Sequence, residues 1–414
     1  MYPLDDLLPA EIISLIIDMV ALEDTQWQVE VPYRDTRACS TTCRAFLPHC
    51  RRHIFSRIEA TVWKLHKFIL LLTNAPWIGH NVRILSIGLE ISLNASMLSA
   101  LRHITLLERL DVVAMNSPKI IWTQLQPGVR SSVLHLMHLP TITDLGFHGI
   151  WNILPSDLSP CGRLRSLTLS QATLTDDSAL VKCRRLCLAG QDANIVNHMT
   201  KILGAGTGTG SLVDSHGLRG LSLEVSDISQ KYGKLLNGFP NLNELEIYLS
   251  SEQAFGTFSA FLVSPSYVLR SLKISSIYFI PMTIPYLARE LQRIGDIAGK
   301  TIQYLNLNFG VFRDNDFSIP IFEWDTLTKV LLDAGRWKSL QHFAIHLSIP
   351  YPRPPDGMHR FVKWNNTVRA HLYKLSSQQR RFKVYYSFHL NLVRYHDRDS
   401  QIYWQEIKEI PSSI

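Results

Sequence analysis

The hexapeptide LRSLTL at residues 164–169 is one of ten short segments that repeat a single apolar pattern along the chain. In each segment the first, fourth and sixth residues are apolar, and the others are mostly polar or small. The last half alternates with a period of two, which is typical of a short β-strand that buries one face. The other nine segments are VRILSI (82–87), LERLDV (107–112), ITDLGF (142–147), CRRLCL (183–188), LRGLSL (218–223), LNELEI (242–247), LRSLKI (269–274), IQYLNL (302–307) and LQHFAI (340–345).

The spacing of these segments predicts a leucine-rich-repeat-like solenoid. Successive segments begin 19 to 38 residues apart, about 29 on average, and helix-like stretches such as IPYLARELQRI (284–294) lie between them. Repeats of this length place each strand beside the next in a parallel sheet, with the intervening segments packed on its outer side. We therefore predict an α/β fold over residues 61–350, an irregular solenoid with parallel strands and outer helices. The alternative is an ordinary α/β domain, but ten strand–helix units without a nucleotide-binding loop argue against it.

The N-terminal residues 1–60 have a helical pattern instead. They favour helices at 9–22, 35–46 and 47–58, with a polar insert at 23–34 after the first helix. Isoleucine, leucine, methionine or valine occupies seven of the positions from 12 to 20. A helix that is apolar around most of its circumference must be covered on most sides. The three short helices cannot supply all of that cover, so the pattern indicates a partner surface.

A C-terminal cap of the solenoid is predicted for residues 351–414. The prolines of IPYPRPPDG (349–357) interrupt regular structure after the last repeat segment. A strand is expected in RRFKVYYSFHLNLV (381–393). We interpret the basic residues of this region as a solvated face, because no recognised nucleic-acid module is visible. The basic residues of the chain are otherwise scattered, so its net charge of +7 is weak evidence for nucleic-acid binding, which we do not expect.

The hydrophobic pattern also predicts where the protein is found. No apolar run approaches the roughly 20 residues needed to cross a bilayer. The N-terminus lacks the cationic start and the cleavage site of a signal peptide. We therefore expect a cytoplasmic or nuclear protein without a membrane partner, in which the six cysteines are reduced.

One cluster of cysteines and histidines, CSTTCRAFLPHCRRH (39–53), could suggest a metal site. Cys39 and Cys43 are four residues apart, as are His49 and His53. Zinc fingers place roughly a dozen or more residues between two such ligand pairs, so we interpret the thiols as buried and the histidines as solvated. The glycine-rich LGAGTGTGS (203–211) lacks the Gly-Lys-Ser/Thr of a phosphate loop. With no hydrolase, zinc-protease or kinase motif, the sequence predicts a protein that is not an enzyme and has no cofactor or metal.

The segment LLPAEIISLIIDMVA (7–21), followed by DTRACSTTCRAFLPHCRRHIFSRI (35–58), resembles an F-box. This three-helix motif opens with Leu-Pro-x-Glu and an apolar helix, and later carries a Cys-Arg phrase. The resemblance covers residues 8–58. The chain is similar to F-box proteins of mushroom-forming fungi, in which a leucine-rich-repeat-like region follows the F-box. Phe46 stands where that family usually has tryptophan.

The resemblance implies a substrate receptor of an SCF-type (Skp–cullin–F-box) ubiquitin ligase. In such a ligase the F-box docks on the Skp adaptor and through it on a cullin, while the repeats hold a protein substrate near the charged ubiquitin. We expect Leu8, Ile12, Ile16 and Met19 to be exposed in the isolated chain, because one face of their helix awaits the adaptor. The residues that match the adaptor-binding positions are Leu8, Pro9, Glu11, Ile12, Ile13, Ile16, Ile17, Cys43, Arg44 and Phe46.

The substrate itself is unknown, but variable positions of the repeat segments are candidates to bind it. These candidates are Arg219, Ser222, Asn243, Glu246, Arg270 and Lys273. The alternative function is a non-degradative, repeat-based protein-binding scaffold whose helical head only caps the solenoid. An enzyme would instead require a deep pocket with convergent titratable side chains.

Overall fold

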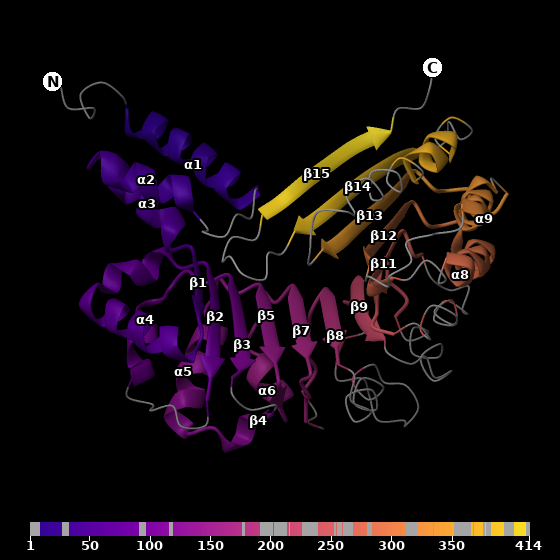
Figure 1. Cartoon of the computed structure of the whole chain (residues 1–414). Helices are drawn as coiled ribbons and strands as arrows, with labels where there is room; N and C mark the ends of the chain where they lie inside the picture. The colour runs from indigo at the N-terminus through magenta and orange to yellow at the C-terminus, as the bar shows by residue number, and fades with distance from the viewer. Residues whose placement is uncertain are drawn as a thin grey trace. The chain divides into compact units, whose positions relative to one another are not determined.

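The chain forms two compact units, Met1–Val181 and Lys182–Ile414 (Figure 1). They are called the first and the second unit. This computed structural model describes residues 9–26, 33–90, 97–115, 119–175, 179–190, 202, 213–214, 216–225, 239–251, 254, 259, 268–279, 284–311, 321–333, 335–351, 366, 368–375, 377, 382–392 and 401–410.

Three helices open the first unit, as the sequence predicts. They are α1 (Ala10–Gln26), α2 (Arg34–Thr42) and α3 (Phe46–Ile54). The Pro9 carbonyl begins α1 by accepting the amide protons of Ile12 and Ile13, at 3.0 and 3.1 Å. The second helix ends earlier than predicted, because Cys43 has an extended backbone that stops α2 before Phe46 starts α3.

A parallel sheet forms the body of the first unit. Its strands lie in sequence order: β1 (Arg57–Ala60), β2 (Ile84–Leu89), β3 (Arg109–Ala114), β5 (Asp144–His148) and β7 (Ser166–Ser170). Two short strands, β4 (Ile120–Ile121) and β6 (Ile150–Trp151), pair separately.

Short helices connect the strands of the first unit. They are α4 (Val62–Asn74), η2 (Pro76–Asn81), η3 (Met97–His103), η4 (Trp122–Gln124), α5 (Pro127–Met137) and α6 (Pro155–Leu158). Helix α4 packs on β1 and β2. Asp157 on α6 joins the β5–β7 connection to the β3–β5 connection, because its Oδ2 accepts hydrogen bonds from Trp122 Nε1 and Arg130 Nη2, both at 2.7 Å.

The second unit continues the same plan. Its parallel strands are β8 (Arg185–Ala189), β9 (Gly220–Val225), β10 (Glu244–Leu249), β11 (Ser271–Phe279), β12 (Tyr304–Val311), β13 (His342–Tyr351) and β14 (Lys383–Leu392). Strand β15 (Gln401–Ile410) then pairs antiparallel with β14. Helices α8 (Ile284–Ala298) and α9 (Ile321–Leu332) pack against each other.

All ten repeat segments contain a strand, and every strand begins at the third residue of its segment. Helix α8 and strand β14 confirm the predicted helix at 284–294 and the predicted strand within 381–393. The sequence analysis missed β1, β4, β6 and β15. The fold is thus mixed α/β, with the parallel, leucine-rich-repeat-like strands that the pattern predicts.

Parallel register aligns the repeats and builds the core. Leu85, Leu110, Leu145 and Leu167 lie side by side on four neighbouring strands, and each is at most 2% exposed. In the second unit, Leu186, Leu221, Leu245, Leu272 and Leu305 form the same kind of row. Because each row buries large apolar side chains, every repeat contributes to one continuous core within its unit.

Among the described residues, no helix has the length and apolar character needed to span a membrane.

We expect the substitution Phe147→Ala to lower the free energy of unfolding by about 3–5 kcal/mol. Phe147 is fully buried in β5, and its ring meets the edge of Trp122 at a centroid distance of 6.0 Å, so its removal leaves a cavity. Urea unfolding monitored by circular dichroism measures the change. Thr168→Ala on β7 is the control, expected within about 0.5 kcal/mol of the original chain. Equal effects of the two substitutions would contradict this description of the core.

Candidate functional site: the open strand faces and the helical head

Alternate strand residues face away from the buried rows and form a largely polar surface, called the open face. In the first unit one row of this face consists of Glu59, Ser86, Asp111, Gly146 and Thr168 on five neighbouring strands. Side chains in such a row are within reach of one another across strands about 4.8 Å apart. The open face therefore brings together polar groups that are far apart in the sequence.

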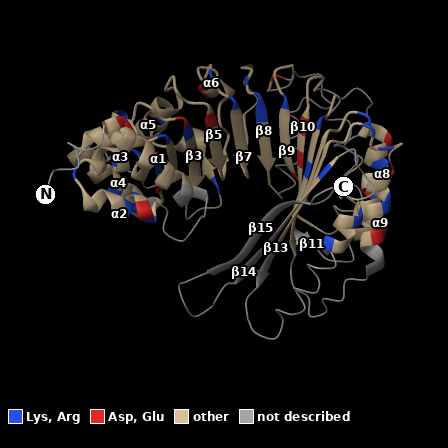
Figure 2. Cartoon of the chain, turned by 90° about the horizontal axis from the view of Figure 1, so that it is seen from above, with Lys and Arg blue, Asp and Glu red and all other residues tan. Residues whose placement is uncertain are grey.

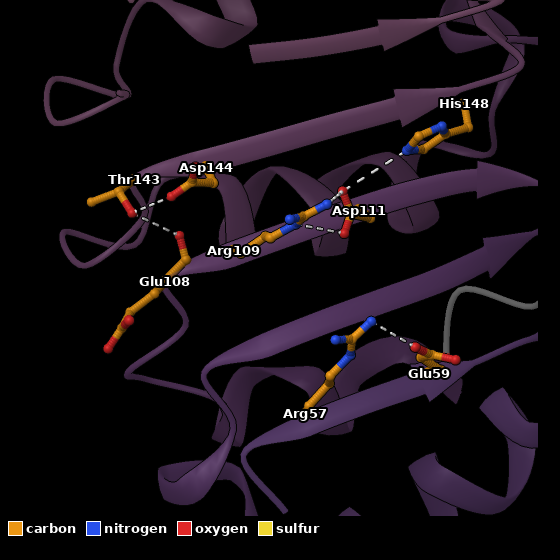
Figure 3. A network of polar contacts seen from close by, with 8 residues as sticks. All are labelled: Arg57, Glu59, Glu108, Arg109, Asp111, Thr143, Asp144 and His148. Carbon is orange, nitrogen blue, oxygen red and sulfur yellow. Dashed lines mark hydrogen bonds and ion pairs between the residues drawn. The ribbon is translucent and has the colours of Figure 1, made fainter. Parts of the chain in front are cut away.

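Asp111 lies at the centre of a polar network on this face (Figure 3). Its carboxylate accepts hydrogen bonds from Arg109, at 2.9 Å from Nε and 3.3 Å from Nη2, and lies 3.9 Å from His148 Nε2. Partial burial alone would raise the pKa of Asp111. The interactions with His148 and Arg109 outweigh burial and hold that pKa below its usual value.

Gly146 makes room for this network. A Cβ atom at Gly146 would lie 2.2 Å from Asp111 Oδ1, so any larger residue would displace the carboxylate. The glycine lies beside Asp111 in the strand register and leaves the space between Asp111 and His148 open.

Short contacts surround the network at the strand starts (Figure 3). Arg57 Nη2 pairs with Glu59 Oε1 at 3.0 Å within β1. The Thr143 hydroxyl donates to Asp144 Oδ2 at 2.6 Å and lies 3.3 Å from the Glu108 carbonyl oxygen. Two arginine–carboxylate pairs, Arg57–Glu59 and Arg109–Asp111, thus lie on the first-unit open face, while Asp144 has a hydroxyl partner.

The open face of the second unit contains a hollow of about 210 Å³ over β8 to β11. Arg185 on β8 reaches across Gly220 on β9 to pair with Glu244 on β10. A Cβ atom at Gly220 would lie 3.1 Å from Arg185 Nε, so this glycine allows the close approach. On the other side, Lys273 Nζ pairs with Glu246 Oε1 at 2.7 Å. The lining residues are Arg185, Gly220, Leu221, Ser222, Glu244, Leu245, Glu246, Ser271 and Lys273.

The structure divides the predicted substrate-binding candidates into two groups. Ser222, Glu246 and Lys273 line the hollow. Arg219, Asn243 and Arg270 instead lie one residue before their strands, at the edge of the sheet. The sequence analysis missed Arg185, Gly220, Glu244 and Ser271. The third position of each repeat segment, where the strand starts and faces outward, is the signal that would have found all four.

Next to the hollow, stacked rings cross three strands of the second-unit open face. Tyr304 on β12 and His342 on β13 are nearly parallel, with ring centroids 4.8 Å apart and an interplanar angle of 5°. His342 also stacks on Tyr385 of β14, at 5.9 Å and 20°. These rings support one another and leave Tyr304 44% exposed.

The helical head, α1 to α3, presents a separate apolar surface. One side of α1 exposes Ile12, Leu15, Ile16, Met19 and Leu22, at 40% to 61% of their area. Ile13 and Ile17 face the other way and are only 3% and 0% exposed. This confirms the predicted exposure of Ile12, Ile16 and Met19, while Leu8 lies outside the described residues. The five exposed residues are called the α1 surface.

The other residues matched by the resemblance are placed as follows. Pro9, Glu11 and Arg44 are exposed, and Cys43 and Phe46 are half-buried. Ile13 and Ile17, which the resemblance assigns to the adaptor, instead pack within the head in this conformation. Because these two side chains attach α1 to the rest of the head, the opposite side of α1 remains exposed.

An ion pair holds α1 against α3. Asp18 on α1 pairs with Arg52 and, at 2.6 Å, with His53 Nε2 on α3. Partial burial raises the pKa of Asp18, but hydrogen bonds from His53 and Arg52 lower it further than burial raises it. The contact therefore orients the α1 surface outward.

The described residues contain no group of three or more histidine, cysteine or acidic side chains that could hold a metal ion. All six cysteines are free thiols. Burial raises the pKa of Cys50 and Cys161 to about 11 and that of Cys183 to about 12. These three thiols are therefore neutral at pH 7 and are poor nucleophiles.

Comparisons with known proteins give little further information. No family model matches the chain, and no curated protein matches it. Among solved structures, an internalin from Listeria monocytogenes is similar over 80% of this chain and 90% of its own. The two share 12% sequence identity, and the TM-score is 0.28.

We expect Gly146→Ala to destabilise the first unit by about 1 kcal/mol at pH 7, because the added Cβ pushes Asp111 away from its partners. Folding lowers the pKa of Asp111, so its stabilising contribution is present above about pH 4 and is lost as the pH falls through the lower folded-state value. The difference between variant and original should therefore shrink below about pH 4. Urea unfolding between pH 7 and pH 3 measures it.

Gly162→Ala is the matched control, since nothing lies within 4 Å of a Cβ added there. It should change stability by no more than about 0.5 kcal/mol at any of these pH values. A loss in Gly146→Ala that stays constant with pH would show that Asp111 is not its cause.

Proposed function

We propose that this chain is an adaptor that binds one protein through its helical head and another through its repeat units. The observation that carries the proposal is the α1 surface, five large apolar side chains on one side of a helix. Exposed apolar side chains that lie together on one helix are typical of a face that docks in a partner's groove.

The energetics favour a protein partner for this surface. Full burial of one large apolar side chain is worth about 1.5–3 kcal/mol. The five residues of the α1 surface are about half exposed already, so docking would gain roughly half of that value at each position. The sum is several kcal/mol, and polar contacts at the rim would add to it. That is enough for a specific but moderate association after the costs of binding.

For the head, we infer that the partner is a Skp-type adaptor, which makes the chain a substrate receptor of an SCF-type ubiquitin ligase. The support is the resemblance of residues 8–58 to an F-box, together with the exposure of Ile12 and Ile16 at matching positions. The receptor would catalyse nothing itself, and it would act in the cytoplasm or nucleus. The repeat units would bind the protein to be ubiquitinated.

A non-degradative scaffold is the second candidate. In favour of it, the head is joined to the repeats by direct contacts. Phe55 meets the edge of Trp77 at 6.1 Å, and Arg51 lies over the same ring at 4.7 Å. A head that only caps the repeats would need such contacts, but it would not need the exposed α1 surface. The two functions therefore differ in whether an adaptor binds.

The test is the double substitution Ile16→Asp/Met19→Asp in the full-length chain. We expect it to weaken binding to a purified Skp adaptor tenfold or more, because it places two charges in an apolar contact. Both side chains are exposed, so circular dichroism and unfolding should be unchanged. Calorimetric titration measures the affinity.

Leu106→Asp/Ile297→Asp provides the control, with two apolar residues exposed at 39% and 38% outside the head. It should bind the adaptor as the original chain does. If the original chain does not bind the adaptor, the SCF role fails and the scaffold function stands. If the α1 variant binds the adaptor as tightly as the original chain, the α1 surface is not the docking site and the proposal fails at that point.

A further inference from the structure

The described loop residues that lead into the strands of the second unit carry mostly positive charge, with Asp214 before β9 and Asp333 before β13 as the acidic residues among them. The six segments closest to the starts of β8 to β13 contain seven Lys or Arg residues and no Asp or Glu. The segments are 182–184, 216–219, 239–243, 268–270, 299–303 and 335–341. Together they form what is called the strand-start edge. In Figure 2 its Lys and Arg positions at the starts of β8 and β9 are blue.

Six of these seven side chains have no ion-pair or hydrogen-bond partner among the described residues. Arg336 is the exception, because it pairs with Asp296 at 2.5 Å and with Asp333 at 2.9 Å. The other six are exposed: Lys182, Arg184, Arg219, Arg270, Lys300 and Lys338. Uncompensated cations so close together repel one another, so an anionic ligand would relieve that repulsion.

Backbone hydrogen bonds fix the positions of the three arginines. The Arg219 amide donates to the Arg184 carbonyl at 2.8 Å, and the Arg270 amide donates to the Asn243 carbonyl at 2.8 Å. Arg184 and Arg270 precede strands that are three places apart in the sheet. Strands are spaced by about 4.8 Å, so the arginines span about 14 Å. This is the length of about four residues of extended polypeptide.

At the corresponding positions of the first unit, one arginine is paired and one is not. Arg83, before β2, lies 3.7 Å from Glu108, before β3, and also donates to the carbonyls of His80 and Leu106. The positive charge of Arg83 is therefore compensated by partners within the first unit. Arg165, before β7, is exposed and its side chain has no ion-pair or hydrogen-bond partner among the described residues, so unpaired arginines at this repeat position occur in the first unit as well.

The surroundings favour an acidic peptide over a nucleic acid. Glu244 and Glu246 lie on the open face directly beyond the edge and already pair with Arg185 and Lys273, so a phosphate chain that extended over these strands would meet paired carboxylates and no unpaired cation among the described residues of β8 to β11. A short acidic segment confined to the edge avoids them. Tyr304 follows the edge, its amide bonded to the Arg270 carbonyl at 2.9 Å, and its exposed ring offers an apolar neighbour to such a segment.

We propose that the strand-start edge binds a short, extended acidic segment of a partner protein. The inference names the partner chemistry for the repeat units, and so it rests on the proposed role of those units in binding a protein. Carboxylates of the segment would pair with Arg184, Arg219 and Arg270, in contacts that weaken with salt.

The experiment measures the affinity of the full-length chain for a labelled octapeptide of alternating glutamate and alanine, by fluorescence anisotropy at low and at physiological salt. The same peptide with glutamine and an oligouridine of eight nucleotides are the comparison probes. Arg219→Gln/Arg270→Gln should weaken binding of the acidic peptide about tenfold. Arg289→Gln/Lys329→Gln on α8 and α9 removes the same charge from exposed helix positions and should change the affinity less than twofold.

Three results would overturn the proposal: equal binding of the glutamine peptide, equal weakening by both double variants, or tighter binding of oligouridine with the same sensitivity to Arg219→Gln/Arg270→Gln. The Ile16→Asp/Met19→Asp variant separates this proposal from the function of the head, since it should bind the acidic peptide normally. Adaptor binding without peptide binding would refute the edge alone, and peptide binding without adaptor binding would refute the SCF role alone.

Discussion

The structure depends on one constraint, the parallel register that sets the same position of each repeat beside its equivalents. Leu85, Leu110 and Leu145 become one buried row because each is the fourth residue of its segment. The same alignment places the intervening residues on the opposite face, where they meet across strands. A shift of one residue would exchange the two faces, so burial of the leucine rows also positions every polar contact on the open faces.

Both open faces contain ion pairs between residues of the face itself. Asp111 takes its partners from its own strand and from β5, whereas Arg185 crosses β9 to reach Glu244. Both arrangements need a glycine, Gly146 or Gly220, because a Cβ there would meet the charged side chain. A glycine thus makes room for these two contacts, whereas Lys273 and Glu246 on neighbouring strands pair without one. These paired surfaces are ordered before any ligand arrives, which lowers the entropic cost of binding.

The sequence predicted the strands better than the contacts between them. The alternating residues of each segment are local information, so the ten strands and the three N-terminal helices could be identified. Strand β1 follows the same pattern, since residues 55–60 read FSRIEA, but part of it fell within the helix predicted for 47–58. Strand β15 pairs only through its antiparallel partner β14. Arg219 and Ser222, but not Gly220, were predicted to bind a substrate, because all variable positions of a segment were treated as equally exposed. Which of them faces outward depends on where the strand starts, and that is set by pairing with neighbouring strands.

The clustering of basic residues also depends on strand pairing and could not be predicted from the sequence, and it bears directly on what the repeat units could bind. Along the sequence Arg184, Arg219 and Arg270 are dozens of residues apart, and a net charge of +7 over 414 residues indicates no binding site. The repeat brings them to equivalent positions before β8, β9 and β11, so that they share one edge. Basic residues that are scattered along the sequence therefore create a local positive electrostatic potential when their spacing matches the repeat. In a solenoid, charge should accordingly be counted along equivalent repeat positions rather than along the chain, because those positions are the ones a bound segment meets together.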